Sequence, residues 1–210
     1  MALTVYLIVD PMCSWCWGFR PVWDEFQASL PDEVVVVDLM GGLAPDTEQP
    51  MDAPTRDYVQ SAWRSVAAKT GARFNFAFWD ECSPRRTTYP ACRAVVAAGL
   101  QRPQARKLMY EAVQSAYFLL AKNPSEESTL IVLAEESGLD ADRFAADLGS
   151  AAVNQQLANE LRKVREFGVT GFPSLIWHWQ PPGDEPRYGL LAAGYTDLDR
   201  LQARWTELVG

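Results

Sequence analysis

Two cysteines separated by two residues, Cys13 and Cys16, stand where a short apolar run ends and a helical pattern begins. The run 3–9 (LTVYLIV) is rich in branched and aromatic residues and has the length of a buried strand. After Cys16, apolar residues recur at steps of three and four, at Phe19, Trp23, Phe26 and Leu30. This spacing places them on one face of a helix. The sequence therefore predicts a pair of thiols at the start of a helix that follows a buried strand.

The two sulfurs are expected to differ in environment. Cys16 shares the apolar face of the helix, so we predict that it points toward the core. Cys13 is predicted to lie at the exposed N-terminus of the helix. Unpaired backbone N–H groups and the positive end of the helix dipole favour a thiolate there. We therefore predict that Cys13 is a nucleophile and that Cys16 is its resolving partner.

Composition narrows the class of protein. A chain of 210 residues with 48% hydrophobic content can bury a large core, and its net charge of −8 argues against a nucleic-acid partner. The first apolar run leads directly into Cys13, unlike a secretory signal, and no run approaches the roughly 18 apolar residues of a membrane span. We expect a cytoplasmic protein with no membrane partner. A mature chain whose removed leader was replaced by Met1 would have the same pattern.

Four cysteines are too few for a disulfide-stabilised secreted scaffold in a chain of this length. In a reducing compartment, a Cys-x-x-Cys pair is either catalytic or a metal ligand. A zinc site would have to add Cys82 and Cys92, which have nine residues between them, and the only histidine, His178, lies in a strand pattern. We expect no metal. Cys92 is predicted to be a buried structural thiol, with a second redox pair, Cys82–Cys92, as the alternative.

Periodicity and turn residues predict an α/β chain in the order β-α-β, a large helical segment, then β-β-α. The predicted strands are 3–9, 33–40, 174–179 and 187–191, with a turn at 181–184. Between 53 and 167 we predict helices at 53–69, 89–100, 103–121, 126–137, 140–148 and 151–167, and a last helix at 197–208. Pro103 is placed in the first turn of its helix, and Ser125 is predicted to cap the next one.

This arrangement, with a Cys-x-x-Cys pair opening its first helix, resembles the thioredoxin fold, and the helical segment between the two halves resembles that of the DsbA family. Residues 1–50 and 166–210 would form the thioredoxin-like domain, and 51–165 an inserted helical domain. Pro21 falls where thioredoxin-like proteins bend this helix. The segment 168–173 (GVTGFP) resembles the family's loop that holds a cis-proline beside the dithiol.

Within that family, segments 10–18 (DPMCSWCWG) and 87–93 (TTYPACR) look most like the FrnE-like, cytoplasmic branch. The second segment also resembles kappa-class glutathione transferases and 2-hydroxychromene-2-carboxylate isomerases. Those relatives typically have serine where Cys13 stands, so the presence of both sulfurs favours disulfide exchange.

The resemblance implies a thiol–disulfide oxidoreductase or isomerase. Its catalytic residues would be Cys13 and Cys16, and its substrate contacts Ser14, Trp15, Phe172 and Pro173. No bound cofactor is expected beyond a redox-active Cys13–Cys16 disulfide, with glutathione as a co-substrate and a disulfide- or thiol-containing protein or small molecule as partner. A glutathione-dependent transferase or isomerase and a peptide-binding chaperone or adaptor are the alternative functions.

The chain departs from the family pattern at two positions. Trp15 replaces the histidine that stabilises the thiolate of periplasmic DsbA, so a strongly oxidising character is not implied. Leu7 stands six residues before Cys13, where thioredoxin has a buried acid. Asp10 is the nearest carboxylate, at the end of the predicted strand.

Overall fold

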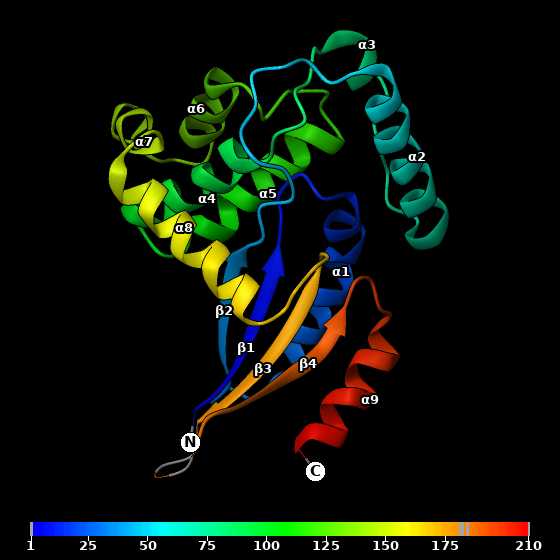
Figure 1. Ribbon diagram of the computed structural model, residues 1–210, viewed down its shortest axis with the longest axis vertical. Helices are drawn as coiled ribbons and strands as arrows, with labels where there is room; N and C mark the ends of the chain where they lie inside the picture. The colour runs from blue at the N-terminus through cyan, green and yellow to red at the C-terminus, as the bar shows by residue number, and fades with distance from the viewer. Residues whose placement is uncertain (1, 181–182, 184, 210) are drawn as a thin grey trace.

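A four-stranded sheet forms the centre of the computed structural model, which describes residues 2–180, 183 and 185–209. The strands are β1 (Ala2–Val9), β2 (Val35–Met40), β3 (Ser174–Gln180) and β4 (Arg187–Ala193), in the spatial order β2-β1-β3-β4 (Figure 1). β1 is parallel to β2 and antiparallel to β3, and β4 lies antiparallel beside β3. The two central strands therefore come from opposite ends of the chain.

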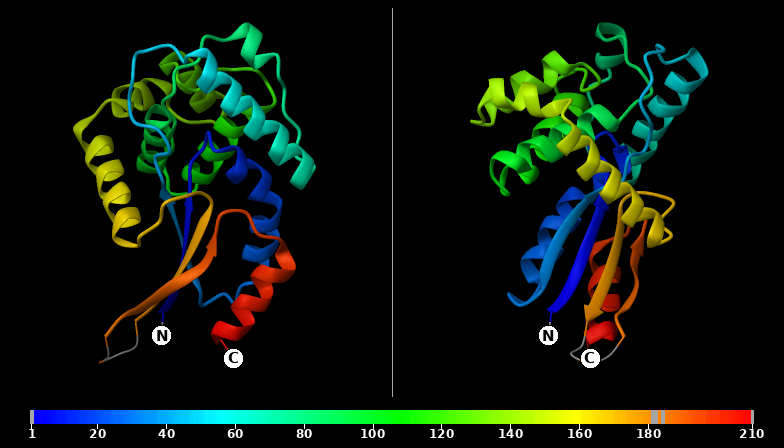
Figure 2. Two further views of the ribbon diagram at one scale, coloured as in Figure 1. Left: turned by 45° about the vertical axis from the view of Figure 1, so that its right-hand side comes forward. Right: turned by 60° about the vertical axis from the view of Figure 1, so that its left-hand side comes forward.

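Helices cover both faces of this sheet (Figure 2). One face carries α1 (Ser14–Ser29) and α9 (Leu198–Val209), and α8 (Ala151–Glu166) lies on the other. The alternation of side chains along β1 divides the core accordingly. Val5, Leu7 and Val9 join the large core on the α1 side, while Tyr6 and Ile8 belong to a second cluster that includes Val164 of α8.

The segment between β2 and β3 is helical, and it gathers at the end of the sheet where β1 ends (Figure 1). Its members before α8 are α2 (Ala53–Thr70), α3 (Phe78–Glu81), α4 (Tyr89–Gln101), α5 (Ala105–Phe118), α6 (Glu127–Glu136) and α7 (Ala141–Leu148). Trp63 is completely buried and packs against rings from three segments, among them Phe74, Trp79 and Tyr117. An aromatic cluster thus holds this helical segment together.

The predicted α/β class and thioredoxin-like order are confirmed, with three local corrections. α1 begins at Ser14, directly after Cys13, in agreement with the predicted helix start. The one-turn helix α3 was not predicted. α5 begins at Ala105, because Pro103 belongs to a preceding turn in which Ala105 N donates to Arg102 O. Ser125 does not cap α6, since Glu126 is the residue before that helix.

The C-terminal limit of α5 is also shorter than predicted. The helix ends at Phe118, where Leu120 N donates to Ser115 O and Lys122 N to Ala116 O, so a wider turn replaces the helical pattern. Residues 181, 182 and 184 of the predicted turn lie outside the described residues. Within the described ranges, no helix combines the length and apolar character needed to cross a bilayer.

Candidate active site

Cys13 is the residue immediately before α1. Its backbone N–H donates to Asp10 O at 3.1 Å, and its carbonyl accepts from Trp17 N at 3.0 Å. The sulfur lies 3.7 Å from the carbonyl oxygen of Phe172. Cys13 Sγ is therefore at the N-terminal end of the helix, where the dipole favours a negative charge, and faces a loop 159 positions away.

Strand pairing brings that loop to the dithiol. β1 and β3 are antiparallel with Ile8 opposite Ser174, so the start of β3 lies beside the end of β1. The Phe172–Pro173 peptide bond, just before β3, is cis. Pro173 O accepts from Gly194 N at 2.7 Å, which ties the loop to the end of β4.

The prediction that Cys13 is exposed is wrong. Its exposed fraction is 6%, against 2% for Cys16. The difference arises from tertiary structure, because the loop before β3 lies against a helix terminus that would otherwise face water. Both cysteines belong to the main core cluster, and they are not joined by a disulfide in this structure.

Cys16 is held in its protonated form. Burial raises the pKa of the Cys16 thiol well above its usual range, and the neighbouring Cys13 sulfur and the Asp10 carboxylate raise it further. A thiol in this setting retains its proton at neutral pH.

Asp10 is a fully buried carboxylate at the end of β1. It accepts hydrogen bonds from Met12 N at 2.8 Å, Leu43 N at 2.7 Å and Thr88 Oγ1 at 2.6 Å. Burial raises the pKa of Asp10, and these hydrogen bonds act in the opposite direction. Asp10 thus connects the segment 87–93 to the loop that carries the dithiol. The sequence pattern placed Asp10 at the end of a strand and did not predict this connection.

The other two cysteines lie in different surroundings. Cys92 is fully buried, as predicted, with its sulfur 3.6 Å from Asp10 Oδ2. Cys82 is partly exposed and contacts Ala121 O at 3.1 Å. Both are reduced.

The described residues contain no group of three or more histidine, cysteine, aspartate or glutamate residues suited to a metal ion. His178 occupies a regular position in β3, opposite Thr4 of β1 and Tyr188 of β4. It is separate from the dithiol and packs edge-on against the ring of Tyr6.

A groove of about 430 Å³ opens beside the dithiol. Its lining residues are Trp15, Lys69, Phe172, Gly194 and Tyr195. The rings of Trp15 and Tyr195 are 6.0 Å apart, and Lys69 is the only charged residue in the lining. Of the four predicted substrate contacts, two line this groove, whereas Ser14 and Pro173 are buried.

Sequence reasoning did not identify Lys69 or Tyr195 as groove residues. Lys69 is in the last turn of α2, and Tyr195 follows β4. Each is distant from Cys13 along the chain, and neither belongs to a recognisable motif. Only the packing of α2 and of the β4–α9 connection beside α1 brings them to the groove.

A family model described as thioredoxin matches residues 6–201. The chain belongs to the thioredoxin family. Among solved structures, this thioredoxin-family protein is similar over its whole length to a candidate protein disulfide isomerase from Nitrosomonas europaea, with 28% identity, a TM-score of 0.85 and 100% of both chains covered. It also shares its fold with the cytosolic disulfide reductase DsbM from Pseudomonas aeruginosa, with 24% identity, a TM-score of 0.73 and 98% of each chain covered.

Curated relatives carry a different description. The protein is 26% identical over 83% of its chain to the ClpXP adapter protein SpxH of Halalkalibacterium halodurans, and spans 58% of that relative's length. It is 24% identical over 99% of its chain to SpxH of Bacillus subtilis, and spans 68% of that protein.

Proposed function

We propose that this protein exchanges thiols and disulfides through Cys13 and Cys16. One observation carries the proposal: Cys13 Sγ lies at the N-terminus of α1, 3.7 Å from the Phe172 carbonyl, with the protonated Cys16 buried one turn along the helix. A nucleophile and a resolving thiol are thus held on one rigid element. The thioredoxin family and the similarity to a candidate disulfide isomerase support the same chemistry.

The reaction has two steps. The Cys13 thiolate attacks one sulfur of a substrate disulfide, forming a mixed disulfide and releasing the other sulfur as a thiolate. Cys16 then loses its proton and attacks Cys13 Sγ, which breaks the mixed disulfide and releases the second substrate thiolate. Two electrons pass to the substrate, and the protein is left with a Cys13–Cys16 disulfide. The reverse sequence oxidises a dithiol.

The groove beside Cys13 suits a small or extended thiol compound. Trp15 and Tyr195 present apolar rings, and Lys69 offers an ammonium group to a carboxylate. Glutathione has this combination of thiol and carboxylates, and DsbM, which shares the fold, has been solved with it. The backbone of Phe172, at the end of a strand, would pair with an extended peptide substrate.

A cytoplasmic location fits this reaction. The relative DsbM is a cytosolic disulfide reductase, and a reducing compartment keeps such a dithiol available to reduce other disulfides. The partner would be a protein or small molecule that contains a thiol or disulfide.

Turnover of glutathione disulfide tests the proposal. We expect Cys13→Ser to abolish turnover, and Cys16→Ser to lower it strongly. Cys82→Ser is the matched control, because Cys82 lies outside the dithiol site and burial together with Glu81 and Glu126 raises its pKa. Full activity of Cys13→Ser, or loss of activity in Cys82→Ser alone, would contradict the assignment.

A second candidate function is that of an adaptor, favoured by the curated relatives named as ClpXP adapter proteins. In that case the protein would bind a partner chain and present it to a protease. Binding that is equal in wild type and Cys13→Ser, with no disulfide turnover by either, would support the adaptor over the exchange enzyme.

A further inference from the structure

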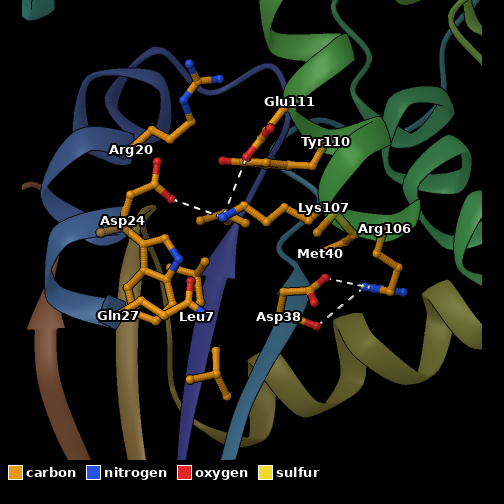
Figure 3. A pocket seen from close by; sticks show the side chains of 13 residues that line it. Leu7, Arg20, Asp24, Gln27, Asp38, Met40, Arg106, Lys107, Tyr110 and Glu111 are labelled. Carbon is orange, nitrogen blue, oxygen red and sulfur yellow. Dashed lines mark hydrogen bonds and ion pairs between the residues drawn. The ribbon is translucent and has the colours of Figure 1, made fainter. Parts of the chain in front are cut away.

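A second cavity, of about 180 Å³, shares no lining residue with the groove beside the dithiol (Figure 3). It is enclosed by α1, α5 and the strands β1 and β2. Leu7, Val9 and Met40 form its apolar floor, and Lys107 reaches across it from α5 to Asp24 of α1 at 3.3 Å. The volume has room for several water molecules, each of which needs roughly 10–15 Å³ on this measure.

This cavity follows the face of α1 that carries Cys16. Arg20, Trp23 and Gln27, at helical spacing from Cys16, all line it. Residues four apart are neighbours on a helix surface, so Cys16 stands one turn beyond Arg20 on the same side. The resolving cysteine therefore lies one helical turn beyond the lining residue Arg20, on the same face of α1.

Tyr110 of α5 also lines this cavity, and its ring extends from α5 toward α1 near Arg20 (Figure 3). Its hydroxyl accepts a hydrogen bond of 2.9 Å from Nε2 of Gln114, a residue with no exposed surface. A hydroxyl has one proton to donate and two acceptor positions, so the Tyr110 O–H is left to donate elsewhere.

The Tyr110 phenol keeps its proton at neutral pH. Burial raises the pKa of Tyr110 well above its usual range, and negative charge on Cys16 and Cys13 raises it further, ahead of Asp10. Tyr110 therefore stays neutral, and it can pass a proton only by accepting one while donating its own. Leu7 stands where the resemblance to thioredoxin would place a buried acid, and the nearest buried carboxylate is Asp10.

We propose that Tyr110, held by Gln114, is a proton relay that carries the proton of Cys16 out through this cavity during the resolving step. The inference rests on the proposed exchange reaction. As Cys16 Sγ attacks Cys13 Sγ, its proton passes to the Tyr110 oxygen directly or through a cavity water, and the Tyr110 proton passes to water. The electron pair of the broken disulfide leaves on the substrate sulfur, so charge and atoms balance.

Other charged groups face Tyr110 from each element around it. They are Asp10 after β1, Arg20 and Asp24 on α1, Asp38 on β2, and Arg106, Lys107 and Glu111 on α5 itself. Asp24 and Glu111 both pair with Lys107, and Asp38 pairs with Arg106. The Asp10 carboxylate pairs with no cation of this set, and its oxygens accept hydrogen bonds from Met12 N, Leu43 N and Thr88 Oγ1. The Tyr110 hydroxyl, by contrast, has a proton left to donate, which suits it to act as a neutral relay.

An aromatic disulfide that releases coloured thionitrobenzoate separates the two steps. Attack by Cys13 releases the first equivalent, and resolution by Cys16 releases the second. Thionitrobenzoate leaves without needing a proton, so loss of the Cys16 proton is the only proton transfer in the second phase. All variants carry Cys82→Ser, which removes the partly exposed fourth thiol.

We expect Tyr110→Phe to slow the second phase about tenfold at neutral pH with the first phase unchanged, and the difference to vanish at high pH, where hydroxide takes the proton. Gln114→Met should slow the same phase to a smaller degree. Tyr117→Phe is the matched control, a buried tyrosine on the same helix that packs among Phe78 and Trp63, and should leave both phases as in wild type.

The outcomes are distinguishable. If wild type releases no second equivalent, the exchange reaction itself fails. If wild type shows both phases and neither Tyr110→Phe nor Gln114→Met changes the second one, the exchange reaction stands and the relay is wrong. An equal slowing of both phases in Tyr110→Phe, without a change in the pH profile, would show a structural role only and would also contradict the relay.

Discussion

At Asp10, one buried carboxylate joins three segments that meet beneath the dithiol: the loop before α1, the chain after β2 and the start of α4. Burial outweighs the hydrogen bonds, so the pKa of Asp10 is raised above its ordinary value of 3.8. The folded protein then binds a proton at Asp10 more readily than the unfolded chain does. This contribution to stability is present at low pH and is lost as pH rises through the raised pKa.

We therefore expect the free energy of unfolding of wild type to fall relative to that of Asp10→Asn as pH rises above about 4. The relative loss should be about 1.4 kcal/mol for each unit by which the folded-state pKa exceeds the unfolded one. Urea unfolding of both proteins between acidic and neutral pH measures the difference.

Asp52 is the control, because its pKa is shifted in the opposite direction from that of Asp10. It is an exposed N-cap whose pKa is lowered by the hydrogen bond from Thr55. Wild type should gain stability relative to Asp52→Asn as pH rises toward about 4, and should keep that gain without further change at higher pH. If the two variants show the same pH trend, the assignment of Asp10 as a carboxylate destabilised by burial is incorrect.

At the scale of single residues, the sequence predicted correctly those features that depend on neighbouring positions in the chain. The two cysteines, the helix start and the buried position of Cys16 follow from spacing over 20 residues. The covering of Cys13 does not, because it depends on a loop 159 positions away. Lys69, Tyr110 and Tyr195 carry no pattern at all, and they become visible only through packing.

At the scale of elements, the contact of the Phe172 ring with the end of β2 determines where the loop before β3 can lie. A Cβ added at Gly41 would stand 2.2 Å from Phe172 Cε1 and 2.4 Å from its Cζ. No side chain fits there without displacement of the ring. The ring of Phe172, the residue whose carbonyl faces Cys13, therefore packs directly against the backbone of Gly41.

We expect Gly41→Ala to displace Phe172 and to slow disulfide exchange by at least tenfold, with a loss of about 1–3 kcal/mol in stability from overpacking. The measurement is glutathione disulfide turnover together with denaturant unfolding.

Gly171→Ala is the matched control. It changes a glycine in the same loop whose added Cβ would meet nothing within 4 Å. It should retain turnover and stability close to wild type. Equal activity of Gly41→Ala and Gly171→Ala would show that the packing of the Phe172 ring against Gly41 does not affect the reaction.

Most elements could be predicted because their apolar periodicity is long. The helices α2, α4, α7 and α8 begin within one residue of the predicted positions. The four-residue helix α3 is too short to show a period, and it forms because Phe78 and Trp79 pack against the Trp63 cluster. Proline is favourable both in a turn and in the first turn of a helix. The position of Pro103 in the sequence therefore could not show whether it belongs to the turn or to α5.

For the whole molecule, an ion-pair network connects the helical segment to the sheet. Arg106 of α5 donates to Asp38 of β2 at 2.8 Å and to both oxygens of Glu160 of α8 at 3.1 Å. Glu160 also accepts from Met40 N at 2.9 Å. One largely buried cluster thus fixes α5 and α8 against the edge strand beside the dithiol.

Arg106→Leu should destabilise the protein by about 3–5 kcal/mol, because it leaves the Glu160 carboxylate buried without its partner. The double variant with Glu160→Gln removes that charge while keeping an acceptor for Met40 N, so it should recover part of the loss. Denaturant unfolding of both tests this. A double variant less stable than the single one would show that the charge of Glu160 is not the source of the cost.

The global arrangement could be predicted from the order of elements, since β-α-β and β-β-α halves with one dithiol have few ways to share a sheet. The network of Arg106 could not, because its members are distributed over β2, α5 and α8, and each appears in the sequence as an ordinary surface charge.

The most direct test of the account is a trap of the first intermediate. Cys16→Ser removes the resolving thiol, so incubation with glutathione disulfide should leave one glutathione attached, and peptide mass spectrometry should locate it on Cys13. Attachment to Cys82 instead, or an unmodified Cys13 under conditions in which Cys82 reacts, would contradict a reactive sulfur at the start of α1.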